Sequence, residues 1–593
     1  MNTTANSRSR RSCISILAVA GAVACSSNAT TAPPPVLTFT RNPCLPVDTV
    51  RIAVAATTLL DCSNGGTTVT FAGGGASYLI VPEFATDQAP FQLVDYSVAS
   101  GPLSAAAATV AASRMRALAQ LRAGLPQSVQ PRAGLPPWRP TAAQQEADRF
   151  MRQRARQLAL SGAFRNAQIR ASGAASAPPD TLRNFQVSSN LAGSTWATVT
   201  ARLAYTGANI LLYIDTLAPA GGFTPTQLQT FGQYFDQTLF PIDTTAFGGP
   251  SDVDQNGHVI MLLSKTVNGL TPTATCNAQG FIAGFFDGED FNGPTDPHSN
   301  QGEIFYSIVP DPNGVFSCAH TVTELNSVVP ATFLHELQHL ISFSQHVIIG
   351  GGQPESSWLD EGQSIAAEEL GSLYYEAKCP PPSCRTDPAQ LFPDSSQGFI
   401  QGFLYDSYQY GLLPDTASIT LEDDGNLGDS WRGGAWLLVR YLVDQGGFGT
   451  YRALEHGPSD GVAVIAQVAG RPFPAVFADF GLSLYTDSLP GLPRTTAPAI
   501  DRFTTRNLRQ LWARLYTTSG PSTAIPLPMP VQLFAVTADT STAVLYPGTV
   551  TYFRLDTPTS SAAVSIRFAA PLGASFPAAL EPQLAVFRLP PGQ

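Results

Sequence analysis

His335-Glu336-Leu337-Gln338-His339 is the stretch that decides the fold and the chemistry predicted for this chain of 593 residues. Two histidines four positions apart lie on the same face of an α-helix, because a helix turns once every 3.6 residues. Both imidazoles can then reach one tetrahedral Zn²⁺ at about 2.0–2.1 Å. Glu336 lies beside that face, where its carboxylate can take a proton from water on the metal. We therefore expect a metal-binding helix with His335 and His339 as ligands and Glu336 as general base.

The residues around this motif have the pattern of a partly buried helix. Pro330 suits a first helical turn, where its missing N–H costs nothing. Apolar residues follow at helical spacing at Phe333, Leu337, Leu340 and Ile341. The alternative is a core helix whose two histidines bind no metal, because such short motifs also arise by chance.

A third ligand would decide between these alternatives. Gln345 stands where the pattern HExxHxxGxxH would have its third histidine, so that pattern does not apply. The glycines at 350–352 predict a loop, and the residues from 357 onward predict a second helix with an acidic first turn. Glu361 on this helix would complete a His₂Glu site that leaves a fourth position for water, as in catalytic zinc sites. The alternative is that Glu361 only interacts with the helix dipole.

The two segments together resemble the gluzincins, and among them the hyicolysin family of bacterial metallopeptidases. The resemblance rests on residues 335–341 and on Trp358-Leu359-Asp360-Glu361-Gly362. It implies a zincin-like domain that holds one Zn²⁺ per chain on His335, His339 and Glu361. It also implies hydrolysis of protein or peptide substrates by a metal-activated water, with Glu336 as general base. The alternative class is a catalytically silent surface binding or adhesion lipoprotein on a peptidase fold.

Composition agrees with a large exported protein of more than one domain. Charged residues are only 13% of the chain and the formal net charge is -11, so no basic face for nucleic acid is expected. Nothing in the sequence indicates the oligomeric state or the cleavage specificity.

The start of the chain has the features of an export signal. Arginines precede an apolar run at 14–24 that is too short to span a bilayer as a mature helix. The run ends in Ala22-Val23-Ala24-Cys25, which resembles a bacterial lipobox. We expect a lipoprotein-type signal peptide at 1–24 and a flexible tether at 25–36. The protein would then reach the bacterial envelope, anchored in the outer membrane through lipid on Cys25, or be secreted if cleavage occurs without lipidation.

The cysteines also favour an oxidising compartment. Without Cys13 in the signal and Cys25 on lipid, six remain, and neighbours pair most simply as Cys44–Cys62, Cys276–Cys318 and Cys379–Cys384. A structural zinc site on cysteines is the alternative.

The predicted fold class is α+β, with the metallopeptidase domain at 179–517 flanked by small sandwich-like β domains at 37–100 and 518–593. Residues 303–309 predict a strand. The resemblance to zinc peptidases implies that it is an edge strand that pairs with substrate. The segment 101–178 is rich in alanine, arginine and proline. It is interpreted as an exposed linker or as an inhibitory prosegment, with one helix capped by Thr141.

A second metal is a further hypothesis. Asp252, Asp254 and Asn256 with Gly257 imitate the first half of a calcium-binding loop, although Leu263 stands where the loop needs its bidentate acid. The alternative is a simple turn at Asn256-Gly257 before an apolar strand.

Overall fold

The structure is a computed structural model that describes residues 42–100, 141–164, 179–379 and 392–593, with short gaps at 45–47, 51, 64–65, 88–91, 393–394, 396, 423–427, 457–459, 493–498, 520–528, 530, 534–538 and 571–573. The predicted signal peptide, tether, lipobox and Cys384 lie outside the described residues. Within the described part, no single helix is long and apolar enough to cross a membrane, although α12 (Gly461–Ala469) and α13 (Phe473–Thr486) pass that test as a pair bent by 84°.

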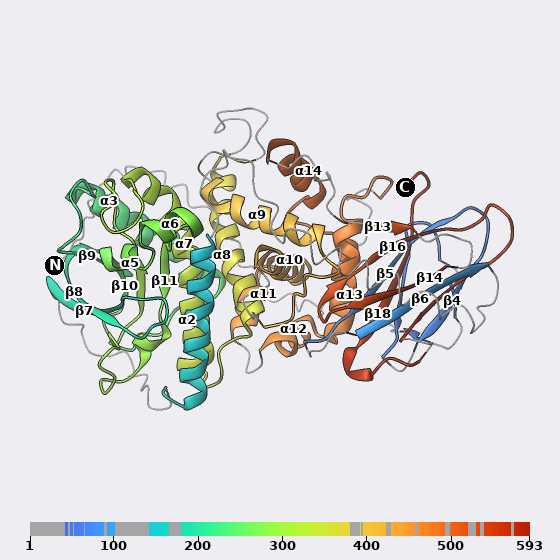
Figure 1. Cartoon of the computed structure of the whole chain (residues 1–593), viewed down its shortest axis with the longest axis horizontal. Helices are drawn as coiled ribbons and strands as arrows, with labels where there is room; N and C mark the ends of the chain where they lie inside the picture. The colour runs from blue at the N-terminus through green and yellow to red at the C-terminus, as the bar shows by residue number, and fades with distance from the viewer. Residues whose placement is uncertain are drawn as a thin grey trace, which may run out of the picture. The chain divides into compact units, whose positions relative to one another are not determined.

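A mixed sheet, of six strands in the described part of the chain, supports the candidate site (Figure 1). Its order is β11-β12-β10-β9-β8-β7. Strands β9, β10 and β12 are parallel, whereas β7, β8 and β11 join antiparallel. The bounds are β7 Leu182–Ser188, β8 Trp196–Thr206, β9 Ile210–Asp215, β10 Val259–Leu263, β11 Gly284–Phe286 and β12 Ile304–Ser307. The central strands β9 and β10 are buried at every position, which is why they read as continuous apolar runs.

The edge of this sheet differs from the sequence expectation. The strand expected within 303–309 exists as β12, but β12 pairs on one side with β10 and on the other with β11. Among the described strands, the edge strand on this side of the sheet is therefore the three-residue β11. The prediction was wrong because a strand as short as β11 shows no alternation of polar and apolar residues in the sequence, and only its pairing with β12 identifies it as a strand.

Helices complete the region that carries the His335–His339 motif. In chain order they are α3 Pro225–Tyr234, η2 Phe235–Leu239, α4 Phe240–Ala246, α5 Lys265–Gly269, α6 Thr273–Gln279, η3 Gly288–Phe291, α7 Val322–Phe343, η4 Ser344–Ile349, α8 Ser357–Lys378, α9 Gln397–Leu412, α10 Gly428–Gly446, α11 Gly449–Glu455, α12, α13, η6 Ala499–Asp501 and α14 Leu508–Ser519. The presence of both helices and sheets is compatible with the predicted α+β class.

Helix α7, which carries the motif, begins earlier than the sequence suggested. Thr321 caps it and forms a reciprocal capping box with Glu324. Pro330 therefore lies inside the helix and not in its first turn, as was expected. The helix begins at its capping box and continues through Pro330. It tolerates this proline because its face toward the sheet is buried and packing stabilises it.

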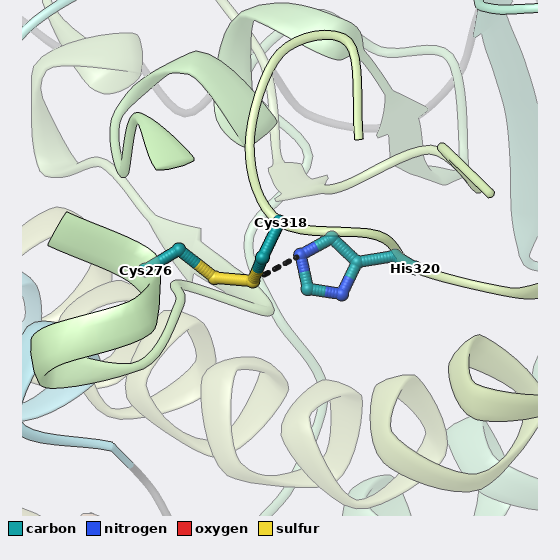
Figure 2. Close-up of side chains that lie close together, drawn as sticks. All are labelled: Cys276, Cys318 and His320. Atoms are coloured by element: carbon teal, nitrogen blue, oxygen red, sulfur yellow. Dashed lines mark hydrogen bonds between the residues drawn. A yellow bond between two sulfur atoms is a disulfide. The ribbon is translucent and has the colours of Figure 1, made fainter. Parts of the chain in front are cut away.

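A disulfide joins Cys276 of α6 to Cys318, just before α7, as predicted (Figure 2). His320 lies beside it, with its Nε2 3.6 Å from Cys318 Sγ. Because the two sulfurs are bonded to each other, this group is not a thiolate zinc site. The predicted pair Cys44–Cys62 is also present.

The two terminal β segments form one structure and not two domains, so the expected division into 37–100 and 518–593 is wrong. Of the described strands, seven make a sheet along β1-β3-β18-β5-β16-β13, with β15 on β5, and five make the sheet β14-β6-β17-β4-β2. The bounds are β1 Asn42–Pro43, β2 Asp48–Val50, β3 Thr57–Asp61, β4 Thr67–Phe71, β5 Ser77–Phe84, β6 Gln92–Ser100, β13 Val531–Leu533, β14 Asp539–Leu545, β15 Thr549–Val550, β16 Tyr552–Asp556, β17 Val564–Ala569 and β18 Pro582–Arg588.

One apolar core fills the space between these sheets. Ile80 and Val586 of the first sheet share a buried cluster with Val69 and Ile566 of the second. Each pair combines one residue from the N-terminal and one from the C-terminal segment, so neither segment has a complete core by itself.

Within 101–178, the structure describes residues 141–164, and most of these form helix α2 (Ala142–Ser161). Thr141 caps it by accepting a hydrogen bond from Gln144 N at 3.2 Å, as predicted. One face of α2 is buried, including Ala143, Ala147 and Met151, and it packs on β11 and η3. This helix is therefore not part of an exposed spacer, which corrects that interpretation for residues 142–161.

Candidate metal centre

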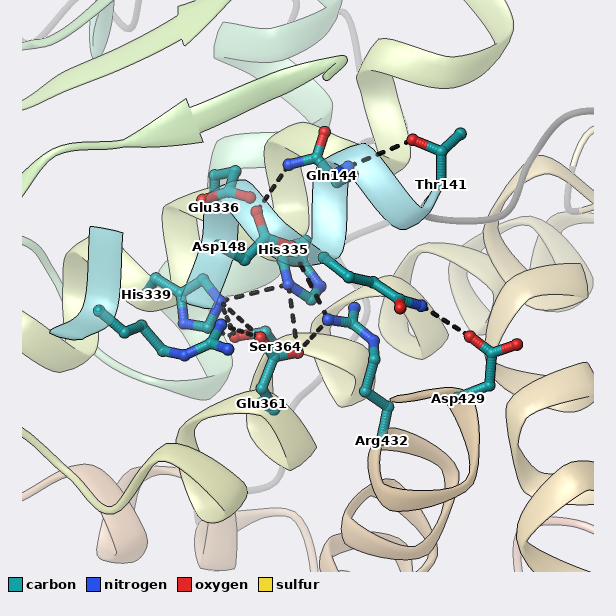
Figure 3. Close-up of polar contacts among 12 residues, drawn as sticks. Thr141, Gln144, Asp148, His335, Glu336, His339, Glu361, Ser364, Asp429 and Arg432 are labelled. Carbon is teal, nitrogen blue, oxygen red and sulfur yellow. Dashed lines mark hydrogen bonds and ion pairs between the residues drawn. The ribbon is translucent and has the colours of Figure 1, made fainter. Parts of the chain in front are cut away.

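Helices α7 and α8 bring the three predicted ligands together (Figure 3). His335 Nε2 lies 3.2 Å from His339 Nε2 and 3.6 Å from Glu361 Oε2, and His339 Nε2 lies 3.8 Å from Glu361 Oε1. Ligand atoms of a tetrahedral zinc at about 2.0–2.1 Å are separated by about 3.3 Å. All three side chains are buried. The donor set and its spacing therefore fit a His₂Glu zinc site.

Carboxylates on α8 orient both imidazoles. Glu368 Oε1 lies 2.9 Å from His335 Nδ1, and Asp360 Oδ2 lies 2.9 Å from His339 Nδ1. Such partners fix the tautomer and leave Nε2 free for the metal. These two positioning residues were missed by the sequence interpretation, although both fall in the acidic helix that it singled out.

Two arginines surround the third ligand. Arg432 Nη1 of α10 lies 2.6 Å from Glu361 Oε2, and Arg152 of α2 pairs with Oε1. Burial alone would raise the pKa of Glu361, but the guanidiniums of Arg152 and Arg432 lower it below the usual range for a glutamate. Glu361 is therefore held as a carboxylate, the form that binds a metal. Sequence reasoning missed both arginines, since nothing local links them to Glu361.

A glycine allows α8 and α10 to approach each other at this point. A Cβ on Gly362 would lie 2.8 Å from the carbonyl oxygen of Ala435. Glycine beside Glu361 thus lets α10 come close enough to place Arg432 on the ligand.

Glu336 lies on the β11 side of the cluster. Its Oε2 accepts a hydrogen bond from Phe286 N at 3.1 Å, whereas its buried Oε1 has no hydrogen-bond partner among the described residues. Burial raises the pKa of Glu336, and the nearby Asp148 raises it further. A cleft with about 580 Å³ of open space lies beside Glu336 and His339. A base that faces a cleft and has an unused oxygen can accept a proton from a water held there.

The second predicted metal site is only partly as expected. Asp252 and Asp254 do lie together, and the third acidic group beside them is Glu303. Asn256 Nδ2 donates to Asp254 Oδ2 at 2.7 Å, and its Oδ1 accepts from His258 N at 2.6 Å. Asn256 is therefore a turn residue, as in the alternative interpretation.

Comparison with known proteins gives one partial similarity. No family model matches the chain. A stretch of 177 residues is 28% identical to the neutral metalloprotease ShpI of Staphylococcus hyicus, covering 29% of this chain and 36% of that protein. The similarity supports a relationship to metallopeptidases and suggests a metal, most simply zinc.

Proposed function

We propose that this chain is an exported zinc endopeptidase that hydrolyses peptide bonds in protein substrates. The observation that carries the proposal is the convergence of His335, His339 and Glu361, with Glu336 beside them and a carboxylate partner on each histidine. A buried core helix with no metal would not need this donor set. The partial similarity to a neutral metalloprotease supports the same class.

The roles of the residues follow from their positions. Zinc, when bound, lowers the pKa of water towards neutrality and polarises the carbonyl of the substrate. Glu336 Oε1, which no described residue hydrogen-bonds, would accept the proton of that water and then deliver it to the leaving amine. Asp360 and Glu368 hold the two imidazoles in place throughout.

The substrate would bind along the edge strand β11. An exposed strand edge offers main-chain N–H and C=O groups to an extended peptide without demanding particular side chains. Because Phe286 N of β11 already binds Glu336, a peptide paired with this strand would pass directly by the general base.

The test is zinc-dependent cleavage of an unfolded protein by the chain from Cys25 onward. We expect fragments of reduced casein in mass spectra, their loss with 1,10-phenanthroline, and their return with added Zn²⁺. Glu146→Gln, an exposed glutamate on α2, serves as the control and should change nothing. If purified zinc-loaded protein never cleaves but binds such chains, the silent binding protein becomes the better assignment.

Export and anchoring complete the proposal. The apolar run, the lipobox-like Ala22-Val23-Ala24-Cys25 and two disulfides between described cysteines support a bacterial envelope lipoprotein.

A further inference from the structure

Helix α2 lies across the candidate metal centre. Its residues Gln144, Asp148, Met151, Arg152 and Ala155 follow the spacing i, i+4, i+7, i+8 and i+11 and therefore share one helix face. The last four of these residues line the same cleft as Glu336 and His339. A solvated spacer would turn this polar face to water, whereas here it is directed at the site.

Gln144 binds the edge strand in the way that a peptide group would. Its Nε2 donates to Gly284 O at 2.7 Å, and its Oε1 accepts from Ala283 N at 2.8 Å. Gly284 is the first residue of β11 and Ala283 immediately precedes it, so the amide of Gln144 binds main-chain groups at the start of the edge strand, where an added strand would bind. Gln144 thus occupies hydrogen-bonding groups that an extended substrate would use.

Asp148 and Arg152, one and two turns further along, engage the catalytic groups. A carboxylate oxygen of Asp148 lies within 4.8 Å of ligand atoms of both His335 and Glu336. Its Oδ1 accepts from Gln144 Nε2 at 2.7 Å (Figure 3), and its Oδ2 makes no hydrogen bond to the described residues. Arg152 pairs with Glu361. Burying a carboxylate and a guanidinium is costly unless each finds a partner of opposite charge. Asp148 has Arg432, whose Nη1 lies 3.8 Å from its Oδ2, and Arg152 has Glu361.

We propose that α2 is an autoinhibitory helix that blocks the cleft of its own chain. While it is docked, Gln144 takes the edge of β11, and Asp148 and Arg152 fill the space in which a scissile peptide would lie. Cleavage then requires α2 to leave the cleft. The inference rests on the proposed function for what is blocked, but the docking of the helix can be measured without any catalysis.

The experiment uses the full chain from Cys25 onward, in three forms. The released variant carries Gln144→Ala, Asp148→Ala and Arg152→Ala, and Gln144→Ala alone is a milder form that touches no metal ligand. The control carries Glu146→Ala and Gln153→Ala on the exposed face of α2. Hydrogen exchange over residues 142–161 reports docking. Anisotropy of a labelled unfolded peptide, measured with Glu336→Ala added to each form, reports access to the cleft.

In wild type and control we expect protected α2 amides and weak peptide binding. The released variant should lose this protection, bind the peptide at least tenfold more tightly and, with Glu336 present, cleave at least tenfold faster. Gln144→Ala alone should lie between these limits. Loss of protection without tighter peptide binding would overturn the proposal, and so would protection and binding that stay at the wild-type level. Tight binding without cleavage in the released variant would support the block and refute the peptidase.

A second site rests on a separate observation. Glu303 is 1% exposed, and within the described part of the chain its Oε2 has no hydrogen-bond partner, although its Oε1 accepts from Ser251 Oγ and Val253 N. One carboxylate oxygen from each of Asp252, Asp254 and Glu303 lies within 4.8 Å of the other two. A cation would neutralise a buried carboxylate that lies beside two further carboxylates, and an all-oxygen donor set favours Ca²⁺ over zinc.

We infer that Asp252, Asp254 and Glu303 bind one Ca²⁺. Melting of the EGTA-treated chain with added Ca²⁺ or Mg²⁺ tests this. Wild type should melt higher with Ca²⁺ than with Mg²⁺, and Glu303→Gln should remove the difference, whereas Glu324→Gln on α7 should keep it. No calcium-dependent shift in wild type, or an equal shift in Glu303→Gln, would refute the site.

Discussion

Replacement of Glu368 should weaken zinc binding, although this residue is not a ligand. Its Oε1 lies 2.9 Å from His335 Nδ1, so it holds the imidazole with Nε2 toward Glu361. Loss of such a partner typically costs about 10–100-fold in metal affinity. Glu368→Ala removes the acceptor and leaves a void in a buried position, so we expect a loss near 100-fold, about 2.7 kcal/mol. Glu368→Gln keeps an acceptor and should lose about tenfold.

The dissociation constant is measured by competition with a chromophoric zinc chelator. Glu376→Ala is the matched control, because Glu376 lies two turns further along α8, partly exposed and paired with Arg506. It should bind zinc like wild type. If Glu368→Ala also binds like wild type, the carboxylate does not position His335 and the reasoning is refuted. Equal losses in Glu368→Ala and Glu376→Ala would indicate general destabilisation of α8.

Three further predictions concern other parts of the chain. Cys25→Ser should abolish palmitate labelling in a bacterial host and release soluble protein; labelling that survives would exclude the lipobox. Burial raises the pKa of Glu83 well above that of an unfolded glutamate, so the native state keeps a proton that the unfolded chain releases, and stability should fall as the pH rises from 5 to 8. Glu83→Gln should reduce this fall in thermal melts, and an unchanged slope would contradict the assignment. Gly362→Ala should cost about 1–3 kcal/mol by forcing α10 away and should weaken zinc binding, whereas Gly249→Ala, which has open space at its Cβ, should do neither.

The sequence predicted what depends on local spacing. The positions of His335 and His339 follow from the helical period, and the cap at Thr141 follows from a short-range hydrogen bond. Neighbouring cysteines paired as expected at Cys44–Cys62 and Cys276–Cys318. The histidines share one helix, Thr141 adjoins the helix that it caps, and each disulfide joins two cysteines with no other cysteine between them in the chain.

Features that depend on distant partners were not predictable in this way. β5 near the start of the chain pairs with β18 near its end, and no local pattern encodes that choice. Arg432 and Arg152 reach Glu361 from helices far away in sequence. The sequence did not indicate the buried face of α2, because glutamine, aspartate and arginine usually indicate a solvated face. Their burial follows from the cleft on which the helix packs.

The measurement that tests the central claim most directly compares Glu336 with Glu336→Ala for cleavage of an unfolded protein. Both proteins carry Gln144→Ala, Asp148→Ala and Arg152→Ala, so that α2 does not limit access. We expect both to hold one zinc per chain and to melt at similar temperatures, and we expect Glu336→Ala to cleave at least about 10²-fold more slowly, the usual minimum for loss of a general base. Equal rates of cleavage in two zinc-loaded proteins would contradict the assignment of Glu336 and, with it, the proposed mechanism.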